Sequence, residues 1–464
     1  MVLKKLKEHF KNSLVIQDDI KDLSQKIDKY TKVEEEISKD LSDKLRDIEK
    51  RLEYLKNNLD FYGNIVKNLN LNFQYCNLEY LNYKVDKNKQ NILLCGFYGG
   101  DNIGDELMLQ TVLEQFQKYP NVKVTVLLDF NDKYNILKNE FSNVAYLHYP
   151  KSVYDFDNLV SQFDKLIFGG GALIDDVIYD FDNPFTITLS KILIDLSLKF
   201  IDSKKDVYWL SLSSNKIIQN DIFISKLIKI VENAKYISLR DTFSFDLLAS
   251  IGCNQSKMHI INDLVLANEK LNYIKKNSYK KLSLGFIPIC SEETKDQNIN
   301  LIKTFIEILD KKNKSFCLKL IPFYGFVNND INYLNNLKDI INDKRVMVAP
   351  FTTNFDEILS LINENEYIVS MRYHCSLLAM VENKKLLTIL YDLHQHYYNK
   401  INYLYERYVK DGNLISLNDI ENYDKLSEIF TNFIYKENKN IFDKKILLKS
   451  QQELTQLVKN IVNE

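Results

Sequence analysis

Two short segments of the sequence place an arginine beside side chains that can bind anions or move protons. Arg372 and His374 lie two residues apart, and Arg240 directly precedes Asp241. A guanidinium group offers a planar fork of donors that suits a carboxylate or a phosphate, and a lysine does not reproduce it. An imidazole can transfer protons near neutral pH. Because the chain has only 6 arginines, we interpret Arg240 and Arg372 as anion-binding residues and His374 as a general acid or base. A surface ion pair and a structural histidine are the plainer alternatives.

Glycine clusters are the second feature that points to chemistry. The chain has 12 glycines, and most of them lie in two clusters, which are Gly96, Gly99, Gly100 and Gly104, and then Gly169, Gly170 and Gly171. Glycine permits positive φ and a close approach of the backbone, so N–H groups can point at an anion. A helix that starts after the first cluster would add the positive end of its dipole. The clusters are therefore predicted to bind substrate, although a tight connection or a flexible turn would also use glycine.

Three polar side chains accompany these glycines and arginines. Asn102 and Asp105 lie in the first glycine-rich segment, and Tyr373 lies between Arg372 and His374. Asp105 can cap the helix that the apolar pattern predicts from this residue onward. We assign Asn102 and Tyr373 to substrate binding, together with the glycines, and count Asp105 among the catalytic candidates.

Each of these segments follows a short apolar run. Such runs recur at 92–95, 122–128, 166–168, 207–212, 236–239, 282–287, 316–321, 346–348, 367–369 and 386–390. Helical patterns separate them, and repeated strand–helix units with apolar strands indicate parallel sheets covered on both faces. The sequence therefore predicts an α/β fold with two Rossmann-like domains, residues 89–270 and 271–400, that face a cleft.

Both ends of the chain are predicted to be helical. Residues 1–88 contain no proline and one glycine, and their apolar residues recur at spacings of mostly four and three, as in a coiled coil. This extension predicts either a homo-oligomer held by the coiled coil or a helical hairpin folded back on the body. Residues 401–464 are interpreted as C-terminal helices.

Composition excludes several classes of protein. The net charge is −2, so no global basic field points to a nucleic-acid partner. No apolar run approaches the ~20 residues of a membrane span, and the N-terminus is charged where a signal peptide has an apolar core. The six cysteines form no CxxC pair and no metal site is indicated. We expect a cytoplasmic protein, with peripheral association with a membrane left open.

Four segments together resemble the polysaccharide pyruvyl transferase family. They are GFYGGDNIGDE from Gly96, FGGGALIDD from Phe168, SLRDTFS from Ser238 and SMRYHCSLLA from Ser370, in the order and approximate spacing of that family. Asp263 is similar to the family's aspartate that follows the first domain. The resemblance covers roughly residues 91–400. It implies a GT-B-like architecture and transfer of a pyruvyl group from phosphoenolpyruvate to sugar hydroxyls in cell-surface polysaccharide synthesis.

The resemblance also implies a role for each candidate residue. Arg240 and Arg372 would clamp the carboxylate and phosphate of phosphoenolpyruvate, and His374 would be the general acid and base. Asp105 would orient the acceptor or act as a helper base. Phosphoenolpyruvate is the donor substrate and a sugar or glycan is the acceptor, so neither a cofactor nor a metal is expected.

Two other functions stay open at this point. A GT-B-like glycosyltransferase that uses a nucleotide sugar would share the double α/β layout and the anion-binding loops. A non-catalytic scaffold in a polysaccharide-synthesis complex would use the predicted coiled coil instead.

Overall fold

The structure is a computed structural model, and its chain divides into two compact units, Met1–Tyr75 and Cys76–Glu464. The residues that the structure describes all lie in the second unit. They are 80, 83–128, 141, 143–150, 155–176, 188–214, 216–273, 282–311, 315–325, 330–390, 395–409, 413–416, 423–435 and 442–464. The coiled coil predicted over residues 1–88 lies outside the described residues except at its end. The proposed self-association therefore stays a prediction.

The first half of the described unit is a parallel sheet of seven strands in the order β3-β2-β1-β4-β5-β6-β7. The strands are β1 (Gln90–Cys95), β2 (Val122–Leu128), β3 (Val144–His148), β4 (Lys165–Ile174), β5 (Asp206–Ser214), β6 (Tyr236–Leu239) and β7 (Met258–Ile260). The strands in the middle of the sheet are mostly apolar and buried, as expected where helices cover both faces of a parallel sheet. The main helices are α3 (Ile103–Phe116), α5 (Asp155–Gln162), α7 (Ser197–Asp202), α8 (Asp221–Asn233) and α9 (Thr242–Ser250).

The second half is a parallel sheet of six strands in the order β10-β9-β8-β11-β12-β13. The strands are β8 (Leu282–Ile287), β9 (Phe316–Leu320), β10 (Val346–Val348), β11 (Tyr367–Ser370), β12 (Lys385–Leu390) and β13 (Asn413–Ser416). Its helices are α10 (Lys295–Lys311), α11 (Asp330–Ile341), α12 (Phe355–Asn363), α13 (Tyr373–Val381), α14 (Gln395–Tyr408) and α15 (Tyr423–Tyr435). Two successive open parallel sheets with covering helices are the arrangement that the sequence predicts.

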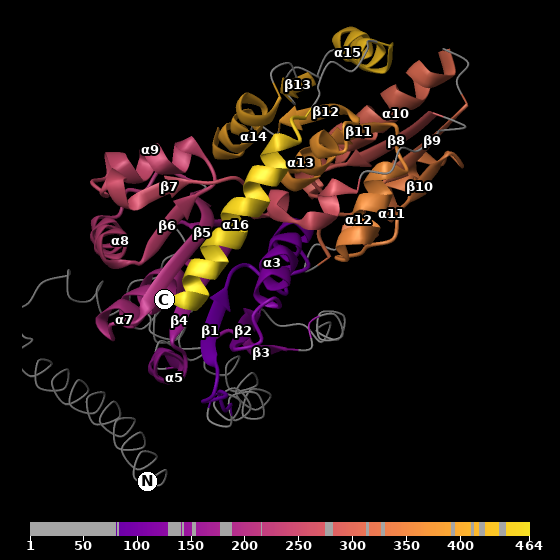
Figure 1. Ribbon diagram of the computed structural model, residues 1–464. Coiled ribbons are helices and arrows are strands. Elements are labelled where there is room, and N and C mark those ends of the chain that lie inside the picture. The colour runs from indigo at the N-terminus through magenta and orange to yellow at the C-terminus, as the bar shows by residue number, and fades with distance from the viewer. Residues whose placement is uncertain are drawn as a thin grey trace, which may run out of the picture. The chain divides into compact units, whose positions relative to one another are not determined.

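The C-terminal segment is not entirely helical, contrary to the sequence-based interpretation of residues 401–464. β13 pairs with β12 and extends the second sheet. The last helix, α16 (Lys445–Asn463), returns to the first half and packs against α3 and the short turn Leu264–Ala267 (Figure 1). Ser450 and Thr455 of this helix hydrogen-bond to Asn262 and Gln115. The C-terminal helix therefore stabilises the first half of the described unit.

Two local expectations are also corrected. The three glycines at 169–171 are part of β4, which continues to Ile174, so they do not form a turn after the strand. Their pairing with β5 becomes irregular after Gly171. Helix α3 begins at Ile103 and is capped by Asn102, whose side chain accepts from the N–H of Gly104, so Asp105 is not the cap. Among the described helices, none is long and apolar enough to cross a membrane.

Candidate active site

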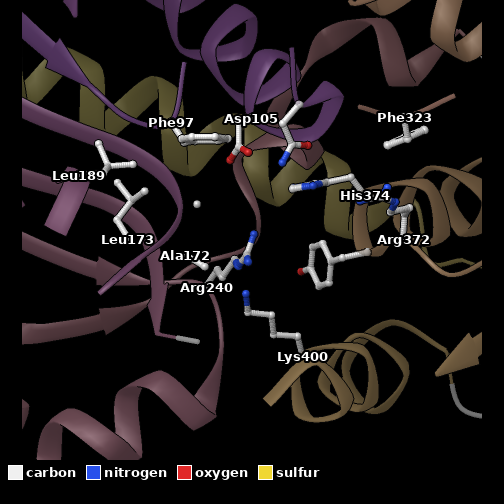
Figure 2. A pocket seen from close by; sticks show the side chains of 13 residues that line it. Phe97, Asp105, Ala172, Leu173, Leu189, Arg240, Phe323, Arg372, His374 and Lys400 are labelled. Carbon is white, nitrogen blue, oxygen red and sulfur yellow. The ribbon is translucent and has the colours of Figure 1, made fainter. Parts of the chain in front are cut away.

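A cavity of about 470 Å³ brings the candidate residues of both halves together. Its lining is Phe97, Asn102, Asp105, Gly171, Ala172, Leu173, Leu189, Arg240, Phe323, Arg372, Tyr373, His374 and Lys400 (Figure 2). Most of these residues follow the carboxyl ends of β1, β6 and β11 or belong to the last residues of β4. Ligands of open α/β sheets bind at this edge, where strands end and loops diverge. The cavity size is typical of a small-molecule site.

Arg240 is held in the protein interior by acidic and aromatic groups. Its side chain is 4% exposed, and its Nη1 donates to Oδ2 of Asp263 at 3.1 Å. Its guanidinium carbon lies 4.6 Å from the centre of the Tyr373 ring, in a cation–π arrangement. Burial acts against the charge, but Tyr373, Asp263 and Asp241 outweigh it and raise the pKa of Arg240. The residue is therefore a permanent cation of the site.

One donor of Arg240 makes no internal hydrogen bond. Its Nε is buried without a hydrogen-bond partner among the described residues, and the nearest carboxylate oxygen, Oδ2 of Asp241, is 3.9 Å away. A buried donor left without an acceptor costs about 1–3 kcal/mol. An oxygen atom from a ligand or a water molecule would remove this cost.

Asp263 connects Arg240 to His374. It is fully buried, and its Oδ2 lies 3.4 Å from Nε2 of His374. Burial alone would raise the pKa of Asp263, but His374 and Arg240 lower it to about 2. The buried carboxylate therefore stays ionised and fixes the imidazole with Nε2 turned inward.

Arg372 enters the cavity from the second half. It follows β11 and is the N-cap residue of α13. Its Nε donates to the carbonyl of Pro288 at 3.3 Å, and its Nη2 lies 3.4 Å from Oδ1 of Asp330. Its side chain is 25% exposed. These contacts orient the guanidinium group without covering it.

The first glycine-rich segment binds the second half through its backbone. Asn102 forms an isolated antiparallel bridge with Tyr324, and the N–H of Gly325 donates to the carbonyl of Asp101 at 3.0 Å. Oδ2 of Asp330 accepts from the N–H groups of Phe323 and Tyr324. Asp330 thus orients Arg372 and also holds the segment around Tyr324 that pairs with the first glycine-rich segment.

One of the glycines predicted to bind substrate lines the cavity, and the others pack against neighbouring side chains or lie outside the lining. Gly171 lines the cavity beside Asp105. Gly99, Gly100, Gly104, Gly169 and Gly170 are not among its lining residues. The N–H of Gly99 is used by the side chain of Glu106, at 2.7 Å. The assignment of these five glycines to substrate binding therefore stays a prediction, and they lie outside the lining of this cavity.

Gly104 instead makes room for the imidazole. A Cβ atom at this position would overlap Nδ1 of His374. Similarly, Gly169 and Gly96 leave space for the Tyr98 ring, whose hydroxyl donates to the carbonyl of Gly169. The glycines therefore act through close packing of side chains, and Gly104 lets α13 bring His374 against α3.

Two groups that line the cavity have pKa values near neutrality. Burial raises the pKa of Asp105 to about 6, against the lowering effect of His374 and Arg240. Burial, reinforced by Arg240, lowers the pKa of Lys400 to about 7. Groups with such values can exchange protons at physiological pH.

Sequence reasoning missed part of the lining. Lys400 is one of 55 lysines, and nothing in the sequence distinguishes it from a surface lysine. Phe97, Leu173, Leu189 and Phe323 are apolar residues of the kind that fill cores. The first two belong to the glycine-rich segments that the sequence analysis selected, so their position could have been inferred from those segments. No group of three or more metal-binding side chains occurs in the described part of the chain.

Comparison with known proteins defines the class first. The fold is GT-B-like, with two α/β domains and parallel sheets. Similar solved structures include UDP-GlcNAc 2-epimerase from Methanocaldococcus jannaschii, with a TM-score of 0.52 and 12% identity over 80% of this chain and 99% of that one. The Neisseria meningitidis UDP-GlcNAc 2-epimerase bound to UDP-GlcNAc has a TM-score of 0.51 and 14% identity over 81% and 100%. HepE of Anabaena in complex with UDP has a TM-score of 0.52 and 11% identity over 81% and 100%.

The sequence itself matches one family. Residues 102–394, well over half of the chain, match the family described as polysaccharide pyruvyl transferase. The chain therefore belongs to the polysaccharide pyruvyl transferase family. A search of curated proteins found no match.

Proposed function

We propose that this protein transfers a pyruvyl group from phosphoenolpyruvate to hydroxyl groups of a sugar in a cell-surface polysaccharide. The observation that carries the proposal is the convergence of Arg240, Arg372 and His374 on one cavity between the two sheets (Figure 2). Phosphoenolpyruvate has two anionic groups, a carboxylate and a phosphate. Two guanidinium groups from opposite sides suit such a molecule, because each can bind one anion through paired hydrogen bonds.

His374 is the proposed general acid and base. The imidazole lines the cavity, with its Nε2 beside the carboxylate of Asp263 and its Nδ1 beside Gly104. In the reaction, a proton moves to the methylene carbon of phosphoenolpyruvate, and its central carbon becomes electrophilic. A sugar hydroxyl attacks this carbon and loses its proton, and the bond to the phosphate oxygen breaks. A second hydroxyl then attacks the same carbon, gives its proton to Asp105 and closes a cyclic ketal, with inorganic phosphate as the other product.

Asp105 is the proposed helper base for the acceptor. With a pKa of about 6, it is mostly ionised at pH 7 but is still basic enough to accept a hydroxyl proton. It lies at the start of α3, near the apolar part of the lining that includes Phe97, Leu173 and Leu189 (Figure 2). We place the acceptor sugar on this side, because the C–H face of a sugar ring can pack against an aromatic and aliphatic surface.

Phosphate release from phosphoenolpyruvate tests the proposal. The full chain would be incubated with phosphoenolpyruvate and a panel of sugar acceptors, and inorganic phosphate would be measured. We expect release that depends on at least one acceptor and a product that carries the pyruvyl mass. The fold is shared with proteins solved with UDP and UDP-GlcNAc, so a parallel assay uses UDP-sugars as donors. Activity with a UDP-sugar and none with phosphoenolpyruvate would replace this proposal with a glycosyltransferase.

Thermal shifts provide an independent readout that needs no acceptor. A ligand that binds the native state raises the melting temperature. We expect phosphoenolpyruvate to raise it more than UDP-sugars do. The absence of a shift with either ligand would favour a non-catalytic scaffold.

A further inference from the structure

Lys400 is a cavity residue that neither the sequence motifs nor the family match includes. It lies on α14, beyond the matched residues 102–394. Its side chain is partly buried and lines the same cavity as Arg240 and Arg372. Figure 2 shows its amino group pointing into the space that Arg240 also faces. Helix α14, which none of the sequence motifs includes, thus places Lys400 at the site.

Basic side chains outnumber acidic ones in the lining of the cavity. Arg240, Arg372 and Lys400 line the cavity together with His374, and Asp105 is the carboxylate of the lining. Arg240 and Arg372 are paired with Asp263 and Asp330, neither of which lines the cavity. A ligand with two or three negative charges would add favourable interactions with the basic side chains that face the cavity.

Charged groups face Lys400 from each element around it. On the first half these are Arg240 after β6, Asp241 at the cap of α9, Asp105 on α3 and Asp175 after β4. Helix α13, which packs on α14, contributes Tyr373 and His374, and α14 itself carries Arg407. Two of the acids have cationic neighbours of their own, since Asp175 lies 3.8 Å from Lys216 and Asp241 lies 3.9 Å from Arg240.

We propose that Lys400 is a third donor-binding residue, which contacts the phosphate group of the ligand and takes up a proton when that ligand binds. The proposal rests on the proposed function only for the identity of the donor. Its geometric basis is the shared cavity, the cationic lining and the direction of the Lys400 side chain.

The expected proton uptake has a definite sign. Burial and Arg240 lower the pKa of Lys400 to about 7, so most molecules carry it neutral at pH 8. A bound phosphate favours the charged form and raises that pKa. Binding at pH 8 therefore consumes protons, and the affinity for the anion decreases as the pH rises above 7.

Calorimetric titration of the full chain at pH 8 measures this uptake. Phosphoenolpyruvate and, separately, inorganic phosphate would be titrated in two buffers with different enthalpies of ionisation, and the difference in heat gives the number of protons taken up. We expect about half a proton or more for the wild type. Lys400→Arg should bind the anion with uptake lowered by that amount, because arginine is already charged. Uptake by His374 or Asp105 would persist in this variant, so the difference isolates Lys400.

A neutral variant tests the contact itself. Lys400→Met should weaken binding of phosphoenolpyruvate by at least about 10-fold, because a hydrogen bond to a charged group is lost. Lys229→Met, which removes an exposed lysine paired with Asp202 on the surface, is the matched control and should bind as the wild type does.

The outcomes separate this proposal from the proposed function. Equal proton uptake in wild type and Lys400→Arg, or unchanged affinity in Lys400→Met, overturns the role of Lys400 and leaves the donor assignment intact. Binding of inorganic phosphate with uptake that depends on Lys400, but no binding of phosphoenolpyruvate, overturns the donor and retains Lys400. If neither anion binds, both proposals fail.

Discussion

The two arginines of the cavity lie in contrasting surroundings. Arg240 is 4% exposed and is bound to a fully buried aspartate and an aromatic ring. Arg372 is 25% exposed and is oriented by one carbonyl and one carboxylate at 3.3 and 3.4 Å. Both line the cavity, but the first is also part of the folded core, whereas the second is partly exposed. Substitutions at Arg240 should therefore affect stability as well as activity, and substitutions at Arg372 should affect activity alone.

The largest effect is expected from removal of the buried carboxylate beside Arg240. Asp263→Asn leaves a buried guanidinium group without its nearest counter-charge and releases His374. Breaking a buried ion pair in this way typically destabilises a protein by about 3–5 kcal/mol. We expect a clearly lower urea midpoint of unfolding, together with loss of activity.

A surface aspartate provides the control for this substitution. Asp343 pairs with Arg345 near the surface, and Asp343→Asn should change stability by no more than about 1 kcal/mol. Arg240→Met combined with Asp263→Asn should recover part of the lost stability, because no unpaired charge stays buried. Equal, small effects of Asp263→Asn and Asp343→Asn would show that Arg240 is not stabilised as described.

A smaller effect, and one confined to activity, is expected at Arg372. Arg372→Lys keeps the positive charge but loses the planar fork that binds an anion through two hydrogen bonds. We expect kcat/KM for phosphoenolpyruvate to decrease by roughly 10- to 100-fold, with an unfolding midpoint close to that of the wild type. Arg345→Lys, a surface arginine of the same half, is the matched control and should retain full activity. Wild-type kcat/KM in Arg372→Lys would remove Arg372 from the donor site.

The smallest of these effects is expected at Gly104, where the two halves meet. Gly104→Ala places a methyl group where the imidazole of His374 lies, so the ring must move while helix α3 itself tolerates alanine well. We expect a decrease in kcat of roughly 10-fold. In a double-mutant cycle, adding Gly104→Ala to His374→Ala should cause no further decrease. Additive losses would show that Gly104 acts independently of His374.

The two arginines also show how much of the site could be predicted from the sequence. Arg240 and Arg372 follow β6 and β11, which are short apolar strands. The apolar pattern alone predicts these strands, and the positions of the two arginines at their ends follow from it. The strands β3, β7 and β13 were missed because they are partly exposed or mixed in composition. The role of Gly104 depends on a side chain 270 residues away, and local sequence carries no information about such a contact. Lys400 was missed for the same reason.

The glycine loop shows a second limit of sequence reasoning. Glycine-rich turns after a strand often present N–H groups to phosphates, and this was the basis of the prediction. Here the N–H of Gly99 binds Glu106, and the backbone at Asp101 binds Gly325. The same spacing thus serves to join the two halves, and we propose that the side chains of Arg240, Arg372 and Lys400 bind the anion.

The most direct test of the account is the activity of His374→Ala. Asp263 and Gly104 hold this imidazole at the cavity, and general acid–base catalysis of this kind contributes about 10²–10⁴ in rate. We predict that phosphate release from phosphoenolpyruvate decreases by about that factor, while the melting temperature and the affinity for phosphoenolpyruvate stay close to those of the wild type. Near-full phosphate release by His374→Ala would contradict the account.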